Sequence, residues 1–248
     1  VSGSQYGLEL AGSYAFGINN IGSLSGTRAG IYLNVATLAG ALGNTGVVNG
    51  GTFGVLASAA LLDSIDNSGT ISGTQHGVYL KSNLTLTGGI NNSGSINKGV
   101  YLQSSSVLTQ GINNSGFIGQ SKIGLGLFGS TLSGGVVNQS SGEITGVGKL
   151  GKGISVDNSS ANGGILNLGL ISGGSYGIYI YQSSLTGGIT NLGSISGGNI
   201  GVHVTQSTLT GGIINSGSIS GGNVGVGAVG STLKGGITNS GLISGTSV

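Results

Sequence analysis

A short motif of apolar and polar residues recurs along the chain at an interval of about 24 residues. Each copy begins with an apolar residue, and an asparagine follows two residues later. The apolar residues are Ile18, Leu42, Ile65, Ile90, Ile112, Val136, Ile165, Ile189, Ile213 and Ile237, and the asparagines are Asn20, Asn44, Asn67, Asn92, Asn114, Asn138, Asn167, Asn191, Asn215 and Asn239. Successive copies are separated by 24, 23, 25, 22, 24, 29, 24, 24 and 24 residues. A fixed period of about 20 to 50 residues is the signature of a repeat architecture.

Three further apolar patches lie between one asparagine and the next. The second apolar position is held by Leu24, Val48, Ile71, Ile96, Ile118, Ile144, Ile171, Ile195, Ile219 and Ile243. The third patch reads Gly-[Ile/Val/Leu]-x-[Val/Leu], as at 30–33, 77–80 and 201–204. The fourth is Ser-Thr-Leu-Thr or a close variant, centred on Leu132, Leu185, Leu209 and Leu233. Because these patches alternate apolar and polar residues and are bounded by Gly, Asn and Ser, they predict short strands and no helix.

A repeat of this length cannot bury its apolar residues alone, but stacked coils form a continuous core. We therefore expect an all-β fold, a single-stranded parallel β-helix (β-solenoid) of about ten coils that extends over 1–248 as one domain, with a longer irregular coil at 136–164. Glycine and asparagine are expected to take the left-handed turn conformations. The ten asparagines are expected to stack at one corner as a ladder of amide hydrogen bonds, with an Asn-lined binding groove as the alternative interpretation.

Composition excludes several other classes of protein. The 248 residues include 57 glycines, only 7 Lys and Arg and 5 Asp and Glu, and no Pro, Cys, Met or Trp. A disordered chain combines low hydrophobicity with high net charge, whereas this one is 37% hydrophobic with a net charge of +2. Collagen is excluded because proline is absent, and no apolar run approaches the ~20 residues of a membrane-spanning helix. We therefore expect a chain that is not embedded in a membrane.

The repeat resembles those of a group of bacterial surface proteins. Segments 90–96 (Ile-Asn-Asn-Ser-Gly-Ser-Ile) and 213–221 (Ile-Ile-Asn-Ser-Gly-Ser-Ile-Ser-Gly) are similar to the passenger repeats of bacterial autotransporters and related β-helical surface proteins. The resemblance covers essentially the whole chain. It implies a right-handed parallel β-helix that is exported, so the expected localisation is extracellular or the bacterial cell surface.

The ionisable residues are too dispersed for a catalytic centre. The acidic residues are Glu9, Asp63, Asp66, Glu143 and Asp157. His76 and His203 are 127 residues apart, which is about five coils or roughly 25 Å along the axis at ~4.8 Å per coil. Asp63 and Asp66 are close in sequence, but Asp66 takes an outward position that Asn or Thr holds in other coils, so we expect it to serve a turn. We therefore expect no enzymatic activity, no cofactor and no metal site. A polysaccharide-degrading β-helix enzyme is the third and least favoured function, since such enzymes need clustered carboxylates.

Two surface features could contact a partner. The outward position of the third patch carries a partial aromatic row, suited to sugar stacking or to cross-coil stacking that stabilises the solenoid, formed by Tyr32, Tyr79, Tyr101, Tyr179 and His203. The 29-residue coil holds Glu143, Lys149, Lys152 and Asp157. We interpret it as a solvated bulge or, alternatively, as a contact site that uses the two lysines. Nucleic acid is not an expected partner, because seven cations spread over ten coils form no dense basic stripe.

These patterns favour a non-enzymatic extracellular structural protein, either a fibre subunit or an adhesin stalk. The ends carry no polar cap, and the phases of Val1 and Val248 in the repeat place them near the same corner. Unprotected strand edges predict head-to-tail association with further copies of the chain into a filament; the alternative is that the chain is a segment of a longer passenger, whose neighbouring coils cap these edges. The alternative is a glycan-binding surface module that uses the tyrosine row, so contact with a cell surface or glycan stays open.

Overall fold

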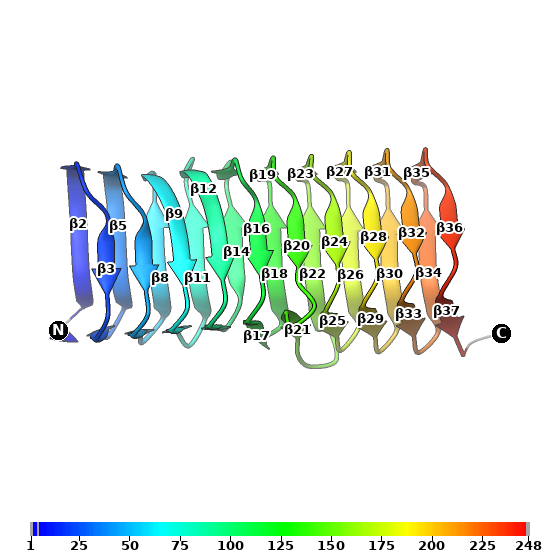
Figure 1. Ribbon diagram of the computed structural model, residues 1–248, viewed down its shortest axis with the longest axis horizontal. Helices are drawn as coiled ribbons and strands as arrows, with labels where there is room; N and C mark the ends of the chain where they lie inside the picture. Colours follow the sequence, from blue (N-terminus) through cyan, green and yellow to red (C-terminus); the bar gives the residue numbers. More distant parts are fainter. Residues whose placement is uncertain (1, 4, 247–248) are drawn as a thin grey trace.

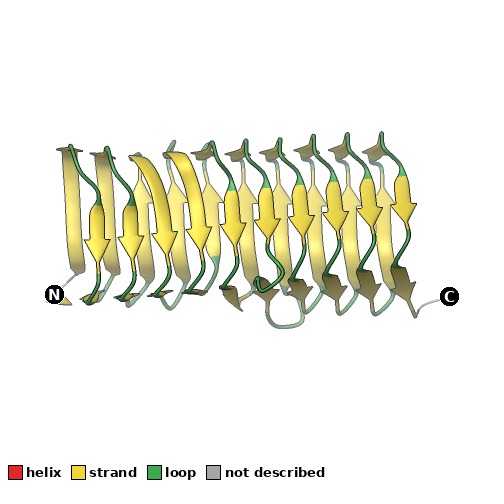
Figure 2. Ribbon diagram, viewed as in Figure 1, coloured by secondary structure: helices red, strands yellow, loops and turns green. Residues whose placement is uncertain are grey.

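The computed structural model describes residues 2–3 and 5–246, which form an elongated rod of stacked coils with the first and last strands, β1 (Ser2–Gly3) and β37 (Leu242–Gly245), at opposite ends (Figure 1). Strands and short turns make up the described chain, and it contains no helix, hence none that could cross a membrane (Figure 2). Every strand pairing is parallel and joins one coil to the next. The expected parallel β-solenoid of about ten coils with a spacing near 24 residues is confirmed. The expectation placed on Val1 and Val248 lies outside the described residues.

Four strand segments follow one another in each coil, and each segment stacks on its counterpart in the next coil. The strands that end on the repeated asparagines are β3 (Ile18–Asn20), β6 (Leu42–Asn44), β9 (Leu61–Asn67), β12 (Thr85–Asn92), β16 (Ile112–Asn114), β20 (Val136–Asn138), β24 (Ile165–Asn167), β28 (Ile189–Asn191), β32 (Ile213–Asn215) and β36 (Ile237–Asn239). The following face is the separate 11-stranded sheet of β1 (Ser2–Gly3), β4 (Ser23–Gly26), β7 (Val47–Gly50), β10 (Thr70–Ser72), β13 (Ser95–Asn97), β17 (Phe117–Ser121), β21 (Glu143–Gly146), β25 (Leu170–Gly173), β29 (Ser194–Gly197), β33 (Ser218–Gly221) and β37 (Leu242–Gly245).

The third and fourth segments complete each coil. The third segment consists of β2 (Tyr6–Tyr14), β5 (Ala29–Leu38), β8 (Phe53–Ser58), β11 (His76–Lys81), β14 (Val100–Gln103), β18 (Ile123–Phe128), β22 (Lys152–Asp157), β26 (Tyr176–Tyr181), β30 (Ile200–Thr205) and β34 (Val224–Val229). The fourth segment is a two-residue strand in later coils, namely β15 (Val107–Leu108), β19 (Thr131–Leu132), β23 (Ser160–Ala161), β27 (Ser184–Leu185), β31 (Thr208–Leu209) and β35 (Thr232–Leu233). In earlier coils it is continuous with a neighbouring segment, as in β9 and β12.

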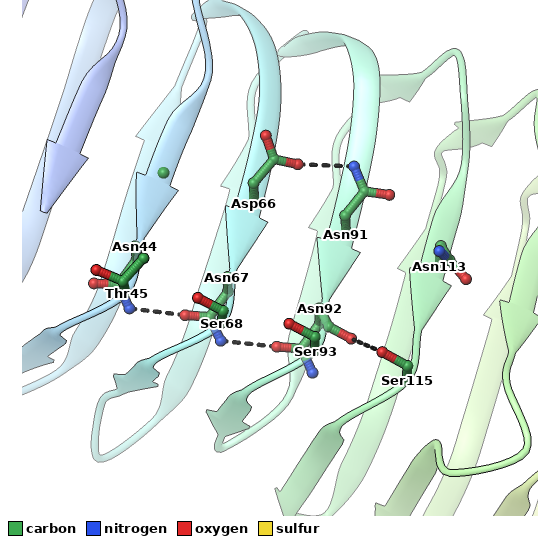
Figure 3. A pocket seen from close by; sticks show the side chains of 11 residues that line it. Asn44, Thr45, Asp66, Asn67, Ser68, Asn91, Asn92, Ser93, Asn113 and Ser115 are labelled. Atoms are coloured by element: carbon green, nitrogen blue, oxygen red, sulfur yellow. Dashed lines mark hydrogen bonds between the residues drawn. The ribbon is translucent and has the colours of Figure 1, made fainter. Parts of the chain in front are cut away.

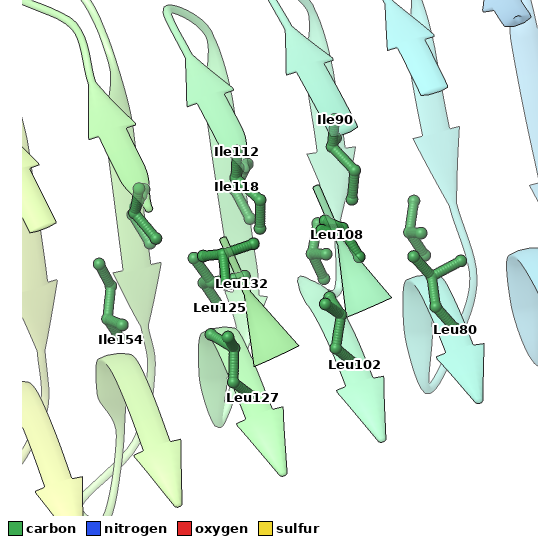
Figure 4. Close-up of a cluster of buried hydrophobic side chains, with 14 of the residues drawn as sticks. Leu80, Ile90, Leu102, Leu108, Ile112, Ile118, Leu125, Leu127, Leu132 and Ile154 are labelled. Carbon is green, nitrogen blue, oxygen red and sulfur yellow. The ribbon is translucent and has the colours of Figure 1, made fainter. Parts of the chain in front are cut away.

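The core is a set of columns in which each apolar residue stacks on its own equivalent in the next coil (Figure 4). Leu80 pairs in register with Leu102, Leu102 with Leu127, and Ile90 with Ile112. Residues in these columns are almost completely buried. Each buried Leu, Ile or Val stabilises the fold by roughly 1.5 to 3 kcal/mol relative to an exposed one. Because the period-2 alternation points these residues inward, the residues between them form the outer faces of the rod.

The long coil at 136–164 contains two insertions rather than one. Asn138 pairs with Asn167, and Glu143 pairs with Leu170. The first pair of positions, Asn138 and Glu143, is five residues apart, whereas Asn167 and Leu170 are three apart. Two extra residues therefore lie between β20 and β21. Between β21 and β22 the chain gains three more, which lengthen the connection to the five residues of the loop 147–151 that projects from the rod (Figure 1). The two insertions lie at opposite ends of β21.

One corner of the solenoid turns through left-handed backbone at residues that are mostly not glycine. This corner lies between the third and fourth segments. The residues with positive φ there are Val35, Ala59, Asn83, Ser105, Gly129, Asn158, Gln182, Gln206 and Gly230. The expectation that Gly and Asn would take these conformations is wrong for Val, Ala, Ser and Gln. Left-handed backbone is costly for such residues. The coil-to-coil hydrogen bonds made by this corner, such as Gln182 N–H to Thr205 O at 3.2 Å, hold the conformation.

Candidate functional site

The repeated asparagines form a continuous ladder along one corner of the rod, which we call the Asn ladder (Figure 3). The Nδ2 of each asparagine donates to the Oδ1 of the next, at 2.8 Å from Asn167 to Asn191 and 2.7 Å from Asn191 to Asn215. The same Nδ2 lies within hydrogen-bonding distance of two backbone oxygens, which for Asn191 are those of Gly193 and Ser218. All ten are joined in this way, and nine of them are buried, with Asn239 exposed. The nine buried amides are engaged in these hydrogen bonds and are not available to a ligand.

A second ladder, made of buried serines, was missed by the sequence reasoning. The backbone N–H of Ser159 donates to the Oγ of Ser183, and the N–H of Ser183 donates to the Oγ of Ser207, at 3.1 and 3.0 Å. Each of these Oγ atoms also donates to a backbone oxygen two residues earlier, as Ser183 does to Tyr181 at 2.6 Å. The signal for this column was the serine before each short fourth segment. The column holds no serine in the earlier coils, where Ala36, Ala60 and Leu84 stand in it.

The hollow beside Asp66 is an open depression whose polar side chains bond mainly to each other (Figure 3). It measures about 300 Å³ and is lined by outward residues of β9, β12 and β16 together with the Asn ladder. The Asp66 carboxylate accepts from Ser64 Oγ and from Asn91 Nδ2, both at 2.8 Å. Asp63 accepts from Thr87 Oγ1 at 3.3 Å. Each carboxylate thus has a hydroxyl or amide partner, and no basic residue lines the hollow.

The outer face of the third segments, here called the aromatic face, carries aromatic rings in three groups. In strand register the outward row runs through Tyr32, Leu56, Tyr79, Tyr101, Gly126, Ser155, Tyr179 and His203. Around this row, the first group pairs Tyr6 with Tyr32 at 4.7 Å between centroids. The second contains Phe53, His76, Tyr79, Tyr101 and Phe128, and the third contains Tyr176, Tyr179, Tyr181 and His203.

The aromatic row is not a continuous exposed stripe. Leu56 and Ser155 occupy outward positions but are buried. Gly126 is roofed by the Phe128 ring, because any Cβ at this position would overlap that ring. Rings that flank the row on some of these strands, such as His76 and Tyr176 at the beginning of β11 and β26, were not foreseen from the sequence. Their positions, three residues before the row, also point outward, and this is the signal that could have revealed them.

Two hollows lie beside the aromatic face at the edge where the loop 147–151 projects. The first, of about 350 Å³, is lined by Lys122, Ile123, Leu150, Lys152, Tyr176 and Tyr179. The second, of about 470 Å³, shares Lys122 and adds Lys98, Tyr101, His76 and Val147 among others. We call the two together the lysine–tyrosine groove. Neither lining contains an acidic residue.

Lys152 is the central charge of this groove. Its Nζ lies 3.7 Å from the centroid of the Tyr179 ring, a close cation–π contact. Burial lowers the pKa of Lys152, while Asp157 at the far end of β22 acts to raise it and Lys122 to lower it further. Lys149, which the sequence singled out together with Lys152, is exposed on the loop and lines neither hollow.

Both histidines lie against aromatic rings of this face. The His76 ring centroid is 4.0 Å from that of Tyr101, and the His203 ring stacks on Tyr176 at 5.5 Å. Burial lowers the pKa of both imidazoles below the ordinary 6.5, and for His203 the charge of Lys152 adds to the effect. Their Nδ1 atoms are buried without a hydrogen-bond partner among the described residues.

The described residues form no group of three or more His, Asp or Glu side chains that could hold a metal ion. Comparisons with protein-family models, with curated proteins and with solved structures found no match. Function therefore has to be inferred from the geometry. The described surface and core contain two internal ladders, a hollow whose carboxylate is hydrogen-bonded, an aromatic face and the lysine–tyrosine groove.

Proposed function

We propose that this chain is a non-enzymatic structural segment of an extracellular or cell-surface protein, of the autotransporter-passenger type that its repeat resembles, serving as a fibre subunit or adhesin stalk. The observation that carries the proposal is the equivalence of the coils along the Asn ladder and the apolar column beside it. Ile165, Ile189 and Ile213 pair in one column, and Asn167, Asn191 and Asn215 pair in the next, without a change of register. Nearly all inward side chains and the whole Asn ladder thus serve to extend a rigid rod.

The distribution of ionisable groups supports a structural role over catalysis. An acid–base mechanism needs groups that converge on one substrate. Asp63 accepts a hydrogen bond from Thr87, and Asp66 accepts hydrogen bonds from Ser64 and Asn91. The two histidines belong to separate aromatic groups on another face. No pair of these groups meets in a hollow.

Coil-on-coil contact also supports self-association. Every coil presents to its neighbour the same strand edges, the same apolar columns and one asparagine, so a coil of a second copy can stack by the same chemistry. In β36, Ile237 of the apolar column and Asn239 of the Asn ladder are exposed. We propose that copies associate head to tail through such contacts.

Electron microscopy of the purified chain tests the self-association. The expected result is filaments with an axial rise of roughly 48 Å per subunit, that is ten coils at ~4.8 Å. Ile237→Lys should abolish them, because it places a charge on the stacking surface, whereas Ile21→Lys at a highly exposed turn should not. A chain that stays monomeric at high concentration would contradict head-to-tail association.

Catalysis is tested separately with polygalacturonate and related polymers. We expect no release of reducing ends and no unsaturated product. Turnover that disappears in Asp63→Asn or Asp66→Asn would overturn the structural assignment.

A further inference from the structure

We propose that the lysine–tyrosine groove binds an anionic polysaccharide, with acidic groups of the sugar rings held by Lys98, Lys122 and Lys152 and the rings packed against Tyr101 and Tyr176. This site is additional to the structural role and does not depend on it. A rod can carry a binding groove on one face whether or not it assembles into filaments.

The placement of the lysines is the first argument. Seven cations are distributed over the whole chain, yet three of them line two hollows that share Lys122. They come from three successive coils, so their backbones are offset along the axis by about one inter-coil step each, roughly 4.8 Å. A polyuronate carries one carboxylate on every ring, and a pyranose ring has a length similar to this step. The groove can therefore meet successive acidic sugars with successive lysines.

The absence of acidic side chains in the lining is the second argument. The nearest carboxylate to act on Lys152 is Asp157, which lies at the other end of β22. Lys152 is half-buried, and burial lowers the pKa of its ammonium group. A partly desolvated cation without a carboxylate beside it gains a charge-assisted hydrogen bond when an anion enters.

The aromatic rings are the third argument. Tyr176 and Tyr101 are partly exposed at the walls of the two hollows, and Ile123 and Leu150 add apolar surface to the first. Sugar rings have apolar C–H faces that pack on tyrosine, while the phenol hydroxyl reaches their hydroxyl groups. The loop 147–151 forms a further wall, since Val147 lines one hollow and Leu150 the other.

A nucleic acid would also combine charge with ring stacking, but it fits less well. Proteins that bind DNA through its backbone commonly neutralise about 6 to 10 phosphates. This groove offers three lysines and no arginine. In addition, the Tyr179 ring is already occupied by Lys152 Nζ at 3.7 Å, so an unstacked base would have to displace the cation.

The proposal is tested by binding of soluble polymers to the purified full chain, measured by calorimetry at low and at moderate salt. The probes are polygalacturonate, dextran sulfate, neutral dextran, polyglutamate and single-stranded DNA. We expect polygalacturonate to bind with an affinity that falls as salt rises, and neutral dextran and polyglutamate not to bind. Preference for dextran sulfate over polygalacturonate, with the same variants affected, upholds an acidic-sugar site and assigns sulfate as the acid.

Four variants locate the site. Lys122 is exposed. Lys122→Gln should lower the affinity for polygalacturonate about tenfold, because one charge-assisted hydrogen bond is lost. Lys152→Gln should do the same or more, and Tyr176→Leu, which keeps the apolar contact, should weaken binding through loss of the ring. Lys234→Gln, outside the groove, is the matched control and should bind as the unmodified chain does.

The outcomes that overturn the proposal are distinct from those that bear on fibre formation. Unchanged affinity in both Lys122→Gln and Lys152→Gln, with folding verified by circular dichroism, would place any binding elsewhere. Equal binding of polyglutamate would show simple charge attraction, and tighter binding of single-stranded DNA would assign a nucleic-acid groove. Failure to bind any of these polymers would remove the site, while filament formation and the lack of turnover would stand unaffected.

Discussion

At the scale of single residues, the corner asparagines combine burial of a polar group with full use of its hydrogen-bonding capacity. Asn191 is fully buried, donates to Asn215 and accepts from Asn167. A buried amide without partners would cost about 1 to 3 kcal/mol. The repeated geometry removes that cost in every coil whose neighbours are present. The corner thus tolerates a polar column inside an otherwise apolar rod.

Replacing Asn191 or Asn215 by Ala should lower the free energy of unfolding by about 1 to 2 kcal/mol each, because the neighbouring amides lose a partner. Chemical denaturation monitored by circular dichroism measures the change. Asn19→Ala is the matched control, since Asn19 precedes the ladder residue in its strand but is exposed. Stability that does not change in either ladder variant would mean that the column contributes nothing beyond its backbone turn.

The two histidines make a prediction about pH. Burial lowers the pKa of His76 and His203 from 6.5, so between the folded and the unfolded values the unfolded chain binds more protons. Stability from this source is therefore complete above about pH 6.5 and is lost as the pH falls through the folded pKa values. The midpoint temperature of thermal unfolding should decrease as the pH is lowered from 7.5 to 5. His76→Phe together with His203→Phe should flatten that profile; an equally steep fall in the double variant would assign the effect to other groups.

Residue positions were predictable where every coil repeats them. Asn20 to Asn239 could be placed in one column because each is two residues after an apolar residue. The serine ladder could not be predicted in this way, because Ala60 and Leu84 hold the equivalent positions in the earlier coils. Tyr101 and Lys152 could be placed on the surface, yet their meeting with Lys98, Lys122 and Tyr176 could not be foreseen. That meeting depends on the directions of long side chains and on the loop 147–151, neither of which the periodicity specifies.

At the scale of elements, glycine is required where one coil lies directly on the backbone of the coil before it. A Cβ at Gly217, just after the Asn ladder, would overlap the carbonyl oxygen of Gly193 and the backbone of Leu192. The equivalent Gly193 meets Gly169 in the same way. The obstacle is backbone, which cannot move without breaking coil-to-coil hydrogen bonds such as Ser218 N–H to Gly193 O at 2.9 Å. Spacing between coils is therefore set by the absence of a side chain.

Gly217→Ala should destabilise the protein by several times the effect of Gly43→Ala. Gly43 is a suitable control because it lies on an outer face, where a Cβ would make only ordinary contacts with Asn19 and Ile18 at 3.6 and 3.7 Å. Thermal unfolding of both variants measures the difference. We expect a loss of roughly 1 to 3 kcal/mol for Gly217→Ala, in the range for overpacked sites. Equal midpoints for the two variants would show that the coils can separate at this corner at little cost.

Elements were predictable in type and order but not in their details. The four apolar patches of the repeat correspond to the four strand segments, since a period of two is unambiguous when glycine and asparagine bound it. The split of the five extra residues of the long coil into two insertions could not be read from its length, because 29 residues are compatible with an insertion at any corner. The left-handed corner at Val35 and Gln182 was missed, since neither residue type signals that conformation.

At the scale of the whole molecule, each coil pairs only with the coils directly before and after it. β25 pairs with β21 and β29, and β26 with β22 and β30, and no pairing among the described strands skips a coil. Stability in such a molecule is a sum of nearest-neighbour terms, so damage to one coil affects its neighbours first. A single globular core would instead transmit the damage everywhere.

Ile144→Lys should therefore divide the rod into two folded halves. Ile144 is fully buried in β21 near the middle of the chain, and an unpaired ammonium group there costs several kcal/mol. Hydrogen exchange measured by mass spectrometry should show rapid exchange in the coils that surround β21, while β4 to β9 and β28 to β33 keep their protection. Ile21→Lys, at a residue that is 79% exposed, should leave the whole pattern unchanged. If instead protection falls equally in all coils of the Ile144 variant, unfolding is all-or-none, and the rod behaves as one cooperative unit despite its nearest-neighbour pairing.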